Sequence, residues 1–169
     1  MSLRTMRLLD ANLNRASEGL RVLEDVARFI LDDQSLSRDL KALRHDVATL
    51  ALGLEVALLS GRDSVTDVGR ESGLSSTADD ALVSLVRANS KRTEESLRVI
   101  EECARLPELA GRLDTLRVER LRYATYDFEK RLVGHLLRLH GRRSITGLYV
   151  VVDRRTVGGG DLCRIAADA

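Results

Sequence analysis

MRLLDANLNRASEGLRVLEDVAR, residues 6–28, recurs 77 positions later as VSLVRANSKRTEESLRVIEECAR, residues 83–105. The two stretches are identical at 11 of 23 positions. Packing can account for a repeated apolar residue, but polar residues that stay in register in two diverged copies call for a chemical reason. The polar matches are Asn12/Asn89, Arg15/Arg92, Glu18/Glu95, Arg21/Arg98, Glu24/Glu101 and Arg28/Arg105.

A second segment is duplicated as well, at a shift of 73, so the repeating unit is predicted to be a pair of helices with a tighter second connection. Two copies are too few for a solenoid, which usually needs three or more repeats. We therefore expect an all-α four-helix bundle, built from a duplicated helical hairpin with pseudo-twofold symmetry. The matches in this segment are Leu36/Leu109, Leu40/Leu113, Leu43/Leu116 and Arg44/Arg117.

Composition limits the class of protein. The 169 residues are 44% hydrophobic with two Phe, three Tyr and no Trp, which favours one helical domain with a core of Leu, Val, Ile and Ala. The 27 basic and 26 acidic residues balance, so no nucleic-acid partner is expected. Neither a signal peptide nor an 18-residue apolar run is present, which predicts a cytoplasmic protein with no membrane partner. Cys103 and Cys163 lack metal or redox spacing, and Cys103 is expected to be a buried, reduced thiol.

Apolar residues at spacings of three and four predict four helices. The first repeat covers about residues 4–60 and the second about 77–140, with a long loop at 60–76 between them. The expected helices run over about 5–31; over 36–58, capped by Ser35 or Ser37 and closed by Gly61; from a capping box at Thr77 and Asp80 to Leu106; and from Pro107 to about His140.

The chain changes character near its end. Residues 1–144 are assigned to the duplicated helical domain, whereas 147–152 (GLYVVV) form a β-type run that leads to a Gly158-Gly159-Gly160 turn. One strand cannot form a sheet. The segment 145–169 is therefore either the truncated start of a second domain, which we favour, or a strand that pairs with another chain.

The repeated polar residues differ in their positions on the helical wheel. Arg21, Glu24 and Arg28 point away from the apolar stripe, as in a solvated salt-bridge ladder. Asn12 instead falls inside the apolar face and Arg15 on its flank, and the same holds for Asn89 and Arg92. A buried Asn must be hydrogen-bonded, and an Arg at the edge of a groove suits bidentate capture of phosphate. Two such Asn/Arg pairs are predicted to meet in one cleft across the pseudo-dyad.

Further candidates lie outside these pairs. Arg44 and Arg117 flank apolar stripes, where they either bind phosphate or pack their stems with the head in solvent. The loop contains Arg62, Asp63, Asp67 and Gly69, a mixture that could hold a metal ion through carboxylates and a phosphate through Arg and backbone amides. No Walker A motif, kinase-type Gly-rich loop or Ser/His/Asp triad is present.

The strings DANLNRASEGLRVLED (10–25), LRHD (43–46) and RDSVTDVG (62–69) together resemble the noncanonical hydroxymethylpyrimidine phosphate kinases of thiamin biosynthesis. This family occurs alone or fused ahead of thiamine-phosphate synthase, and the resemblance covers about residues 4–140. Residues 147–169 also look like the first strand, loop and helix start of the synthase barrel. The resemblance implies transfer of the ATP γ-phosphoryl group, with Mg²⁺, to hydroxymethylpyrimidine monophosphate, and a C-terminal synthase domain as partner. A barrel fragment of this length cannot carry synthase activity.

On this hypothesis, one Asn/Arg/Glu set holds the substrate phosphate and the other set the nucleotide phosphates. Two alternatives stay open: a non-catalytic helical domain that dimerises or delivers substrate to the synthase, and a regulator that binds a phosphorylated metabolite. The sequence also leaves a homodimer open. The proposed residues are Arg15, Arg92 and Asp67 for catalysis; Asn12, Asn89, Arg44, Arg62, Gly69 and Arg117 for substrate and phosphate binding; and Asp67, Glu18 and Glu95 for metal.

Overall fold

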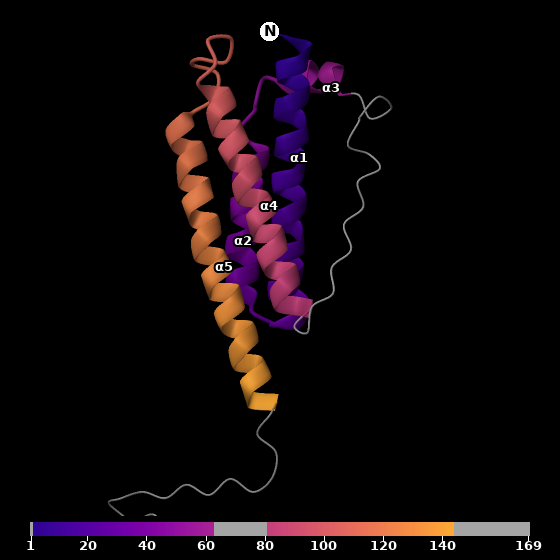
Figure 1. Cartoon of the computed structure of the whole chain (residues 1–169), viewed down its shortest axis with the longest axis vertical. Coiled ribbons are helices and arrows are strands. Elements are labelled where there is room, and N and C mark those ends of the chain that lie inside the picture. The colour runs from indigo at the N-terminus through magenta and orange to yellow at the C-terminus, as the bar shows by residue number, and fades with distance from the viewer. Residues whose placement is uncertain (1, 63–80, 144–169) are drawn as a thin grey trace, which may run out of the picture. The chain divides into compact units, whose positions relative to one another are not determined.

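The computed structural model describes residues 2–62 and 81–143, with side chains up to Gly141, and every regular element in this part of the chain is helical (Figure 1). The expected all-α fold is thereby confirmed. The capping box at Thr77 and the β-type run 147–152 lie outside the described residues. The elements are α1 (Leu3–Asp25), a π-helical turn η1 (Val26–Ile30), α2 (Gln34–Ala48), α3 (Glu55–Gly61), α4 (Ala81–Ala104) and α5 (Thr115–Arg143).

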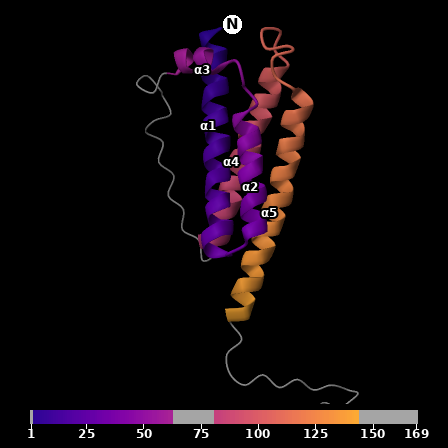
Figure 2. The same ribbon diagram turned by 180° about the vertical axis from the view of Figure 1, so that it is seen from behind.

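The long helices form a bundle within the compact unit that ends at Arg138. α1 packs against α2, α3 and α4, and the two views agree that α1 and α4 lie side by side and antiparallel (Figures 1 and 2). α5 is tied to α4 by the ion pair Arg122–Glu101 and to α2 by Arg131–Asp39. The first helices of the two copies therefore pack against each other.

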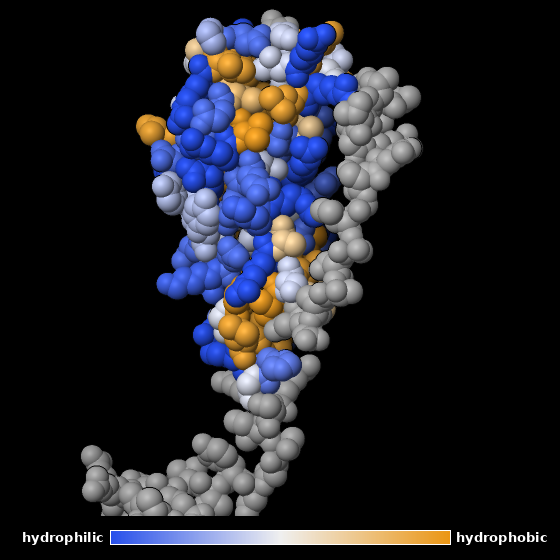
Figure 3. Space-filling view, in the orientation of Figure 1, coloured by the Kyte–Doolittle hydropathy of each residue, from blue (hydrophilic) through white to orange (hydrophobic). Residues whose placement is uncertain are grey.

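Aliphatic side chains fill the core, as their excess in the sequence predicts. Phe128 is the single aromatic residue among the buried side chains of the described ranges, and Cys103 is buried there as a free thiol whose pKa is raised by burial. The outer face in Figure 3 is mostly hydrophilic, with hydrophobic residues in separate patches. None of the described helices is long and apolar enough to cross a bilayer. Fully buried core residues include Met6, Leu9, Leu20, Leu23, Leu36, Leu40, Val86, Leu97, Ile100, Leu109 and Leu132.

The prediction of one continuous second helix is wrong. α2 ends at Ala48, a turn follows in which Gly53 adopts a φ of 85°, and α3 begins at Glu55. A positive φ suits glycine and interrupts a helix. The apolar periodicity continues across this turn because Leu50, Leu54 and Leu58 all still face the core. The cap also differs, since Asp33, rather than a serine, accepts a hydrogen bond from the Leu36 backbone N–H at 2.9 Å.

The fourth predicted helix begins later than expected. Residues 105–114 form a series of turns that includes Pro107 and ends after Gly111, whose φ is 73°. Asp114 then accepts a hydrogen bond from the Arg117 N–H at 3.1 Å, and α5 starts at Thr115. A proline can open a helix, but here the short-range turn bonds from Leu106 and Leu109 take precedence.

This later start changes the register of the second duplication. Leu116 is 68% exposed although its predicted counterpart Leu43 is buried, so the shift of 73 is wrong for the helix itself. A shift of 78 matches buried residues with buried residues and pairs Arg44 with Arg122. The second connection is thus longer than the first, not tighter. The buried matches are Leu40/Val118, Leu43/Leu121, Val47/Thr125, Leu50/Phe128, Leu54/Leu132 and Leu58/Leu136.

Candidate functional site

The repeated asparagines occupy equivalent places in α1 and α4. Asn12 and Asn89 are 4% and 5% exposed, and each donates its amide N–H to the backbone carbonyl one turn earlier, of Leu8 and Leu85, at 2.8 Å. This bond satisfies the buried donor inside its own helix and leaves the side-chain carbonyl facing outward. In the second copy that carbonyl accepts a hydrogen bond from Arg92 at 3.1 Å.

α1 and α4 approach closely at Gly19. A Cβ built at Gly19 would overlap the Thr93 hydroxyl and stand 3.0 Å from the Asn89 carbonyl oxygen. Thr93 itself donates to that carbonyl at 2.9 Å, so its side chain is fixed. The sequence has glycine in the first copy and Ser96 at the equivalent place in the second. This tight contact sets the spacing of the two helices next to Arg92.

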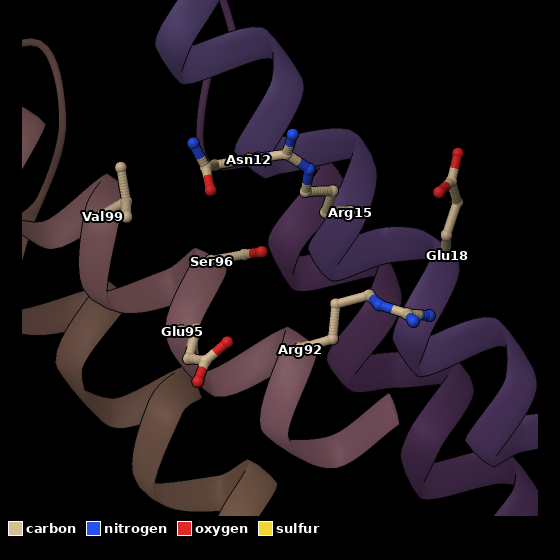
Figure 4. Close-up of a pocket in the computed structure, with 7 residues that line it drawn as sticks. All are labelled: Asn12, Arg15, Glu18, Arg92, Glu95, Ser96 and Val99. Atoms are coloured by element: carbon tan, nitrogen blue, oxygen red, sulfur yellow. The ribbon is translucent and has the colours of Figure 1, made fainter. Parts of the chain in front are cut away.

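A cleft of about 510 Å³ lies along this helix pair (Figure 4). Residues of both copies line it, and the shift of 77 relates Arg15 to Arg92 and Glu18 to Glu95. The predicted meeting of the two arginines in one cleft is therefore what the structure shows. The prediction that both Asn/Arg pairs line the cleft holds for Asn12 but not for Asn89, which is absent from the lining and accepts a hydrogen bond from Arg92, a lining residue. The lining residues are Asn12, Arg15 and Glu18 of α1 and Arg92, Glu95, Ser96 and Val99 of α4.

The charged groups of the cleft are largely free to bind. Arg15 and Glu18 are exposed, and neither forms an ion pair or side-chain hydrogen bond within the described ranges. Glu95 has only a long contact to Lys91, at 4.0 Å. Each guanidinium offers five N–H donors in a planar fork, which matches phosphate oxygens. With two arginines and two glutamates, the cleft can neutralise an oxyanion and also offer carboxylate oxygens to a cation.

Most of the other repeated charges form ion pairs, but the expectation that Glu24 points away from the apolar stripe is wrong, because Glu24 is 5% exposed. Arg28 forms no ion pair among the described residues and lies over the Phe29 ring instead. Arg21 pairs with Asp25 at 3.4 Å, and Arg98 and Arg105 pair with Glu101 at 3.1 and 2.7 Å. Glu101 is 3% exposed, so these arginines hold its charge inside the bundle. Their role is structural, in contrast to Arg15.

Three further arginines named from the sequence are engaged in ion pairs and do not line the cleft. Arg44 binds Glu24 at 2.9 Å across α1 and α2, and Arg62 holds Asp10 in a bidentate pair at 2.8 and 2.9 Å, which raises the pKa of the guanidinium. Arg117 bonds the Thr49 hydroxyl at 2.7 Å and the Asp46 carboxylate at 3.2 Å. Their role in phosphate binding stays a prediction.

The metal site was placed partly on residues outside the described ranges, since Asp67 and Gly69 fall there. Within residues 2–62 and 81–143, no three His, Cys, Asp or Glu side chains cluster as metal ligands. Glu18 and Glu95 nevertheless both line the cleft. Sequence reasoning missed Ser96 and Val99, which the periodicity of α4 places on the face of Arg92 and could have revealed.

It also missed Glu94. This residue is 5% exposed, and burial, followed by the charge of Glu129, raises its pKa from 4.5 to about 7. Ser17 occupies the equivalent position in the first copy, so the duplication gave no signal there.

The domain is thus a helical bundle in which the first helices of the two repeats, α1 and α4, line one polar cleft. The chain belongs to the ThiD2 family, whose model matches residues 7–131.

Similar proteins include several thiamine-phosphate synthases. That of Rhodopirellula baltica is 38% identical over 136 residues, which cover 76% of this chain and 35% of that protein. The synthase of Synechococcus sp. strain WH7803 is 41% identical over 138 residues, covering 78% and 37%, and that of Synechocystis sp. is 38% identical over 149 residues, covering 86% and 40%. The chain thus spans well under half the length of these relatives. No solved structure matches the chain.

Proposed function

We propose that this domain acts in thiamin biosynthesis and transfers the γ-phosphoryl group of ATP to hydroxymethylpyrimidine monophosphate. The observation that carries the proposal is the position of Arg15 and Arg92, which come from the two copies and line one cleft. Membership of the ThiD2 family and similarity to proteins named thiamine-phosphate synthase support it. The product, a pyrimidine diphosphate, is the species that a synthase domain would consume.

The reaction requires positioning and charge neutralisation more than covalent catalysis. An oxygen of the substrate monophosphate attacks the γ-phosphorus of ATP, the bond from that phosphorus to the bridging oxygen breaks, and ADP leaves. Two negatively charged ligands must therefore be held close together. Arg15 on one wall and Arg92 on the other can each bind one of them through paired N–H donors.

The carboxylates of the cleft fit a magnesium ion. Mg²⁺ keeps several waters and typically takes one or two protein carboxylates together with substrate phosphates, and Glu18 and Glu95 supply two such groups. When bound, the ion would neutralise charge on the transferred phosphoryl group. A contribution from Asp67, as the sequence suggested, belongs to the same proposal.

The test compares Arg15→Ala and Arg92→Ala in an assay of pyrimidine diphosphate and ADP formation. Each substitution removes a charge-assisted contact, so kcat/KM is expected to fall by about tenfold to a hundredfold or more. Arg112→Ala is the matched control, since Arg112 is exposed in the turn before α5 and forms no ion pair among the described residues. Near wild-type activity of both cleft variants would exclude the two-arginine clamp.

The non-catalytic alternative predicts a different result for the same purified protein. A helical domain that merely positions a synthase would bind neither ATP nor the pyrimidine phosphate by calorimetry, and would form no diphosphate. A regulator of thiamin metabolism would bind a phosphorylated ligand at the cleft without product. Either outcome would replace the kinase proposal.

A further inference from the structure

A second cavity, of about 430 Å³, lies between α4 and α5 and adjoins the cleft described above. We refer to it as the α4–α5 cavity. Glu95 and Val99 line both spaces, so the two lie side by side. The remaining lining residues that matter here are Glu94, Arg122 and Tyr126. Nothing in the proposed phosphoryl transfer uses these three.

One oxygen of the Glu94 carboxyl group lacks a hydrogen-bond partner within the described ranges, while the group also interacts with the Glu129 side chain through charge and a hydrogen bond. The oxygen without a partner is Oε1, which is buried. The residue as a whole is only 5% exposed and lines the α4–α5 cavity. A buried polar atom without a partner costs folding free energy, so such atoms are rare in native proteins. Its pKa of about 7 means that near neutral pH the carboxyl group can act both as a donor and as an acceptor. These properties suit a carboxyl group that pairs with a ligand.

Tyr126 gives the same cavity a fixed aromatic surface. The residue is 41% exposed, its hydroxyl accepts a hydrogen bond from Arg122 at 3.3 Å, and its ring meets that of Tyr123 in an edge contact with centroids 5.9 Å apart. Arg122 is in turn held by Glu101 at 3.2 Å. An exposed ring that is already oriented loses little entropy when a flat ligand stacks on it.

The first copy lacks both features. By the shifts of 77 and 78, Ser17 stands where the second copy has Glu94, and Ala48 where it has Tyr126. Their neighbours agree better, since Arg44 corresponds to Arg122 and both bind the equivalent glutamates of their copies. The scaffold therefore does not require the carboxyl group or the ring, which argues for a role in ligand recognition on one side of the dyad.

We infer that the α4–α5 cavity binds a planar heterocycle that carries an amino group beside a ring nitrogen. The amino group and ring nitrogen pair with Glu94, the ring stacks on Tyr126, and the phosphate of the ligand extends into the cleft to Arg92. Both the aminopyrimidine and the adenine of the proposed reaction present this edge, and in that respect the inference rests on the proposed function. Recognition of the ring nevertheless requires no transfer chemistry.

The experiment measures binding of two unphosphorylated probes by calorimetry: 4-amino-5-hydroxymethyl-2-methylpyrimidine and adenosine. One of them is expected to bind at millimolar concentration or below, and the one that binds identifies the source of the ring. Glu94→Ser and Tyr126→Ala, which restore the polar or small character of the first copy, should each weaken that binding by about tenfold or more. Glu94→Gln and Tyr126→Phe retain the pairing edge and the ring, and should stay within a few-fold of wild type.

Thermal melting of each variant separates loss of fold from loss of binding, and Arg112→Ala should bind like wild type. Binding of neither probe, or binding that Glu94→Ser and Tyr126→Ala leave unchanged, would overturn the inference and leave the kinase proposal intact. Ring binding that depends on Glu94 in a protein without diphosphate formation would support the inference while the kinase proposal fails.

Discussion

Gly19 of α1 and Thr93 of α4 face each other with no room for a methyl group between them. The Thr93 hydroxyl donates a hydrogen bond to the backbone carbonyl of Asn89, so it cannot rotate away without losing a buried hydrogen bond. The Asn89 carbonyl oxygen itself would stand 3.0 Å from an added Cβ. The backbone of α1 at Gly19 therefore packs directly against Thr93 and the backbone of Asn89 in α4. The cleft residue Arg92 is next to this contact in sequence.

Gly19→Ala is expected to destabilise the bundle by about 1 to 3 kcal/mol, because overpacking outweighs the gain in helix propensity. Urea unfolding measures the change. Gly134→Ala is the matched control: it lies within α5, where the nearest atom to a new Cβ is 3.5 Å away, and it should be neutral or stabilising by up to about 1 kcal/mol. The double variant with Thr93→Ala should recover part of the loss, and strict additivity would argue against direct contact.

Glu24 and Glu101 are buried at equivalent positions of the two copies. Removal of their arginine partners is expected to lower the stability of the fold by unequal amounts. Glu24 depends on Arg44 at 2.9 Å, because Arg21 is 4.0 Å away, whereas Glu101 keeps Arg98 and Arg105 when Arg122 is lost.

Arg44→Met should therefore cost about 2 to 3 kcal/mol and Arg122→Met about 1 kcal/mol, since an unpaired buried carboxylate is the larger penalty. Chemical denaturation of both variants gives the comparison. Arg38→Met serves as a surface control, because its contact with Asp39 is 3.9 Å long and exposed, and it should change stability by less than about 0.5 kcal/mol. Equal losses for Arg44→Met and Arg122→Met would contradict the assigned pairings.

The raised pKa of Glu94 predicts a pH dependence of stability. The folded state holds this proton more tightly than the unfolded chain, with a pKa of about 7 against 4.5, mainly through burial and then through Glu129. Glu95 adds to the rise in pKa and Lys91 opposes it. The resulting stabilisation is complete below about pH 4.5 and is lost as the pH rises through 7.

Glu94→Gln abolishes this titration while it keeps the shape of the side chain. At pH 8.5 the variant should be more stable than wild type by about 1 to 3 kcal/mol, and near pH 5 the two should differ little. Thermal melts across this range provide the measurement. A constant difference between variant and wild type at every pH would mean that the Glu94 pKa is not raised.

Periodicity and repetition in the sequence predicted the helical bundle, its aliphatic core and the shared cleft. Asn12 and Arg15 could be singled out because a polar residue on an apolar helix face is informative by itself. The register of α5 could not be predicted, because leucines at spacings of three and four fit several alignments and Pro107 is compatible both with a helix start and with the turns that precede Thr115.

Glu94 and Tyr126 escaped notice for another reason. They have no counterpart in the first copy, so the comparison of repeats gave them no weight. Whether Arg62 ends in an ion pair or in a ligand site likewise depends on Asp10, a residue 52 positions away, which local patterns do not reveal.

The arginines of the cleft differ in how they are held, and this difference predicts unequal effects of the neighbouring asparagines. Arg92 donates a hydrogen bond to the side-chain oxygen of Asn89 at 3.1 Å, whereas Arg15 has no such bond among the described residues. Asn89→Ala should therefore lower kcat/KM for diphosphate formation by about tenfold through loss of Arg92 positioning, and Asn12→Ala by less.

Lysine substitutions make the same point at the arginines themselves. Arg15→Lys and Arg92→Lys keep the charge but lose the planar fork, so each should lower kcat/KM by roughly tenfold or more, while Arg112→Lys leaves it unchanged. If each copy holds one ligand, one variant should raise the KM for ATP and the other the KM for the pyrimidine phosphate. Steady-state kinetics with each substrate varied in turn resolve the two. A rise in the same KM for both variants would show that the two arginines grip a single ligand, and the donor and acceptor sites would then have to be sought elsewhere along the cleft.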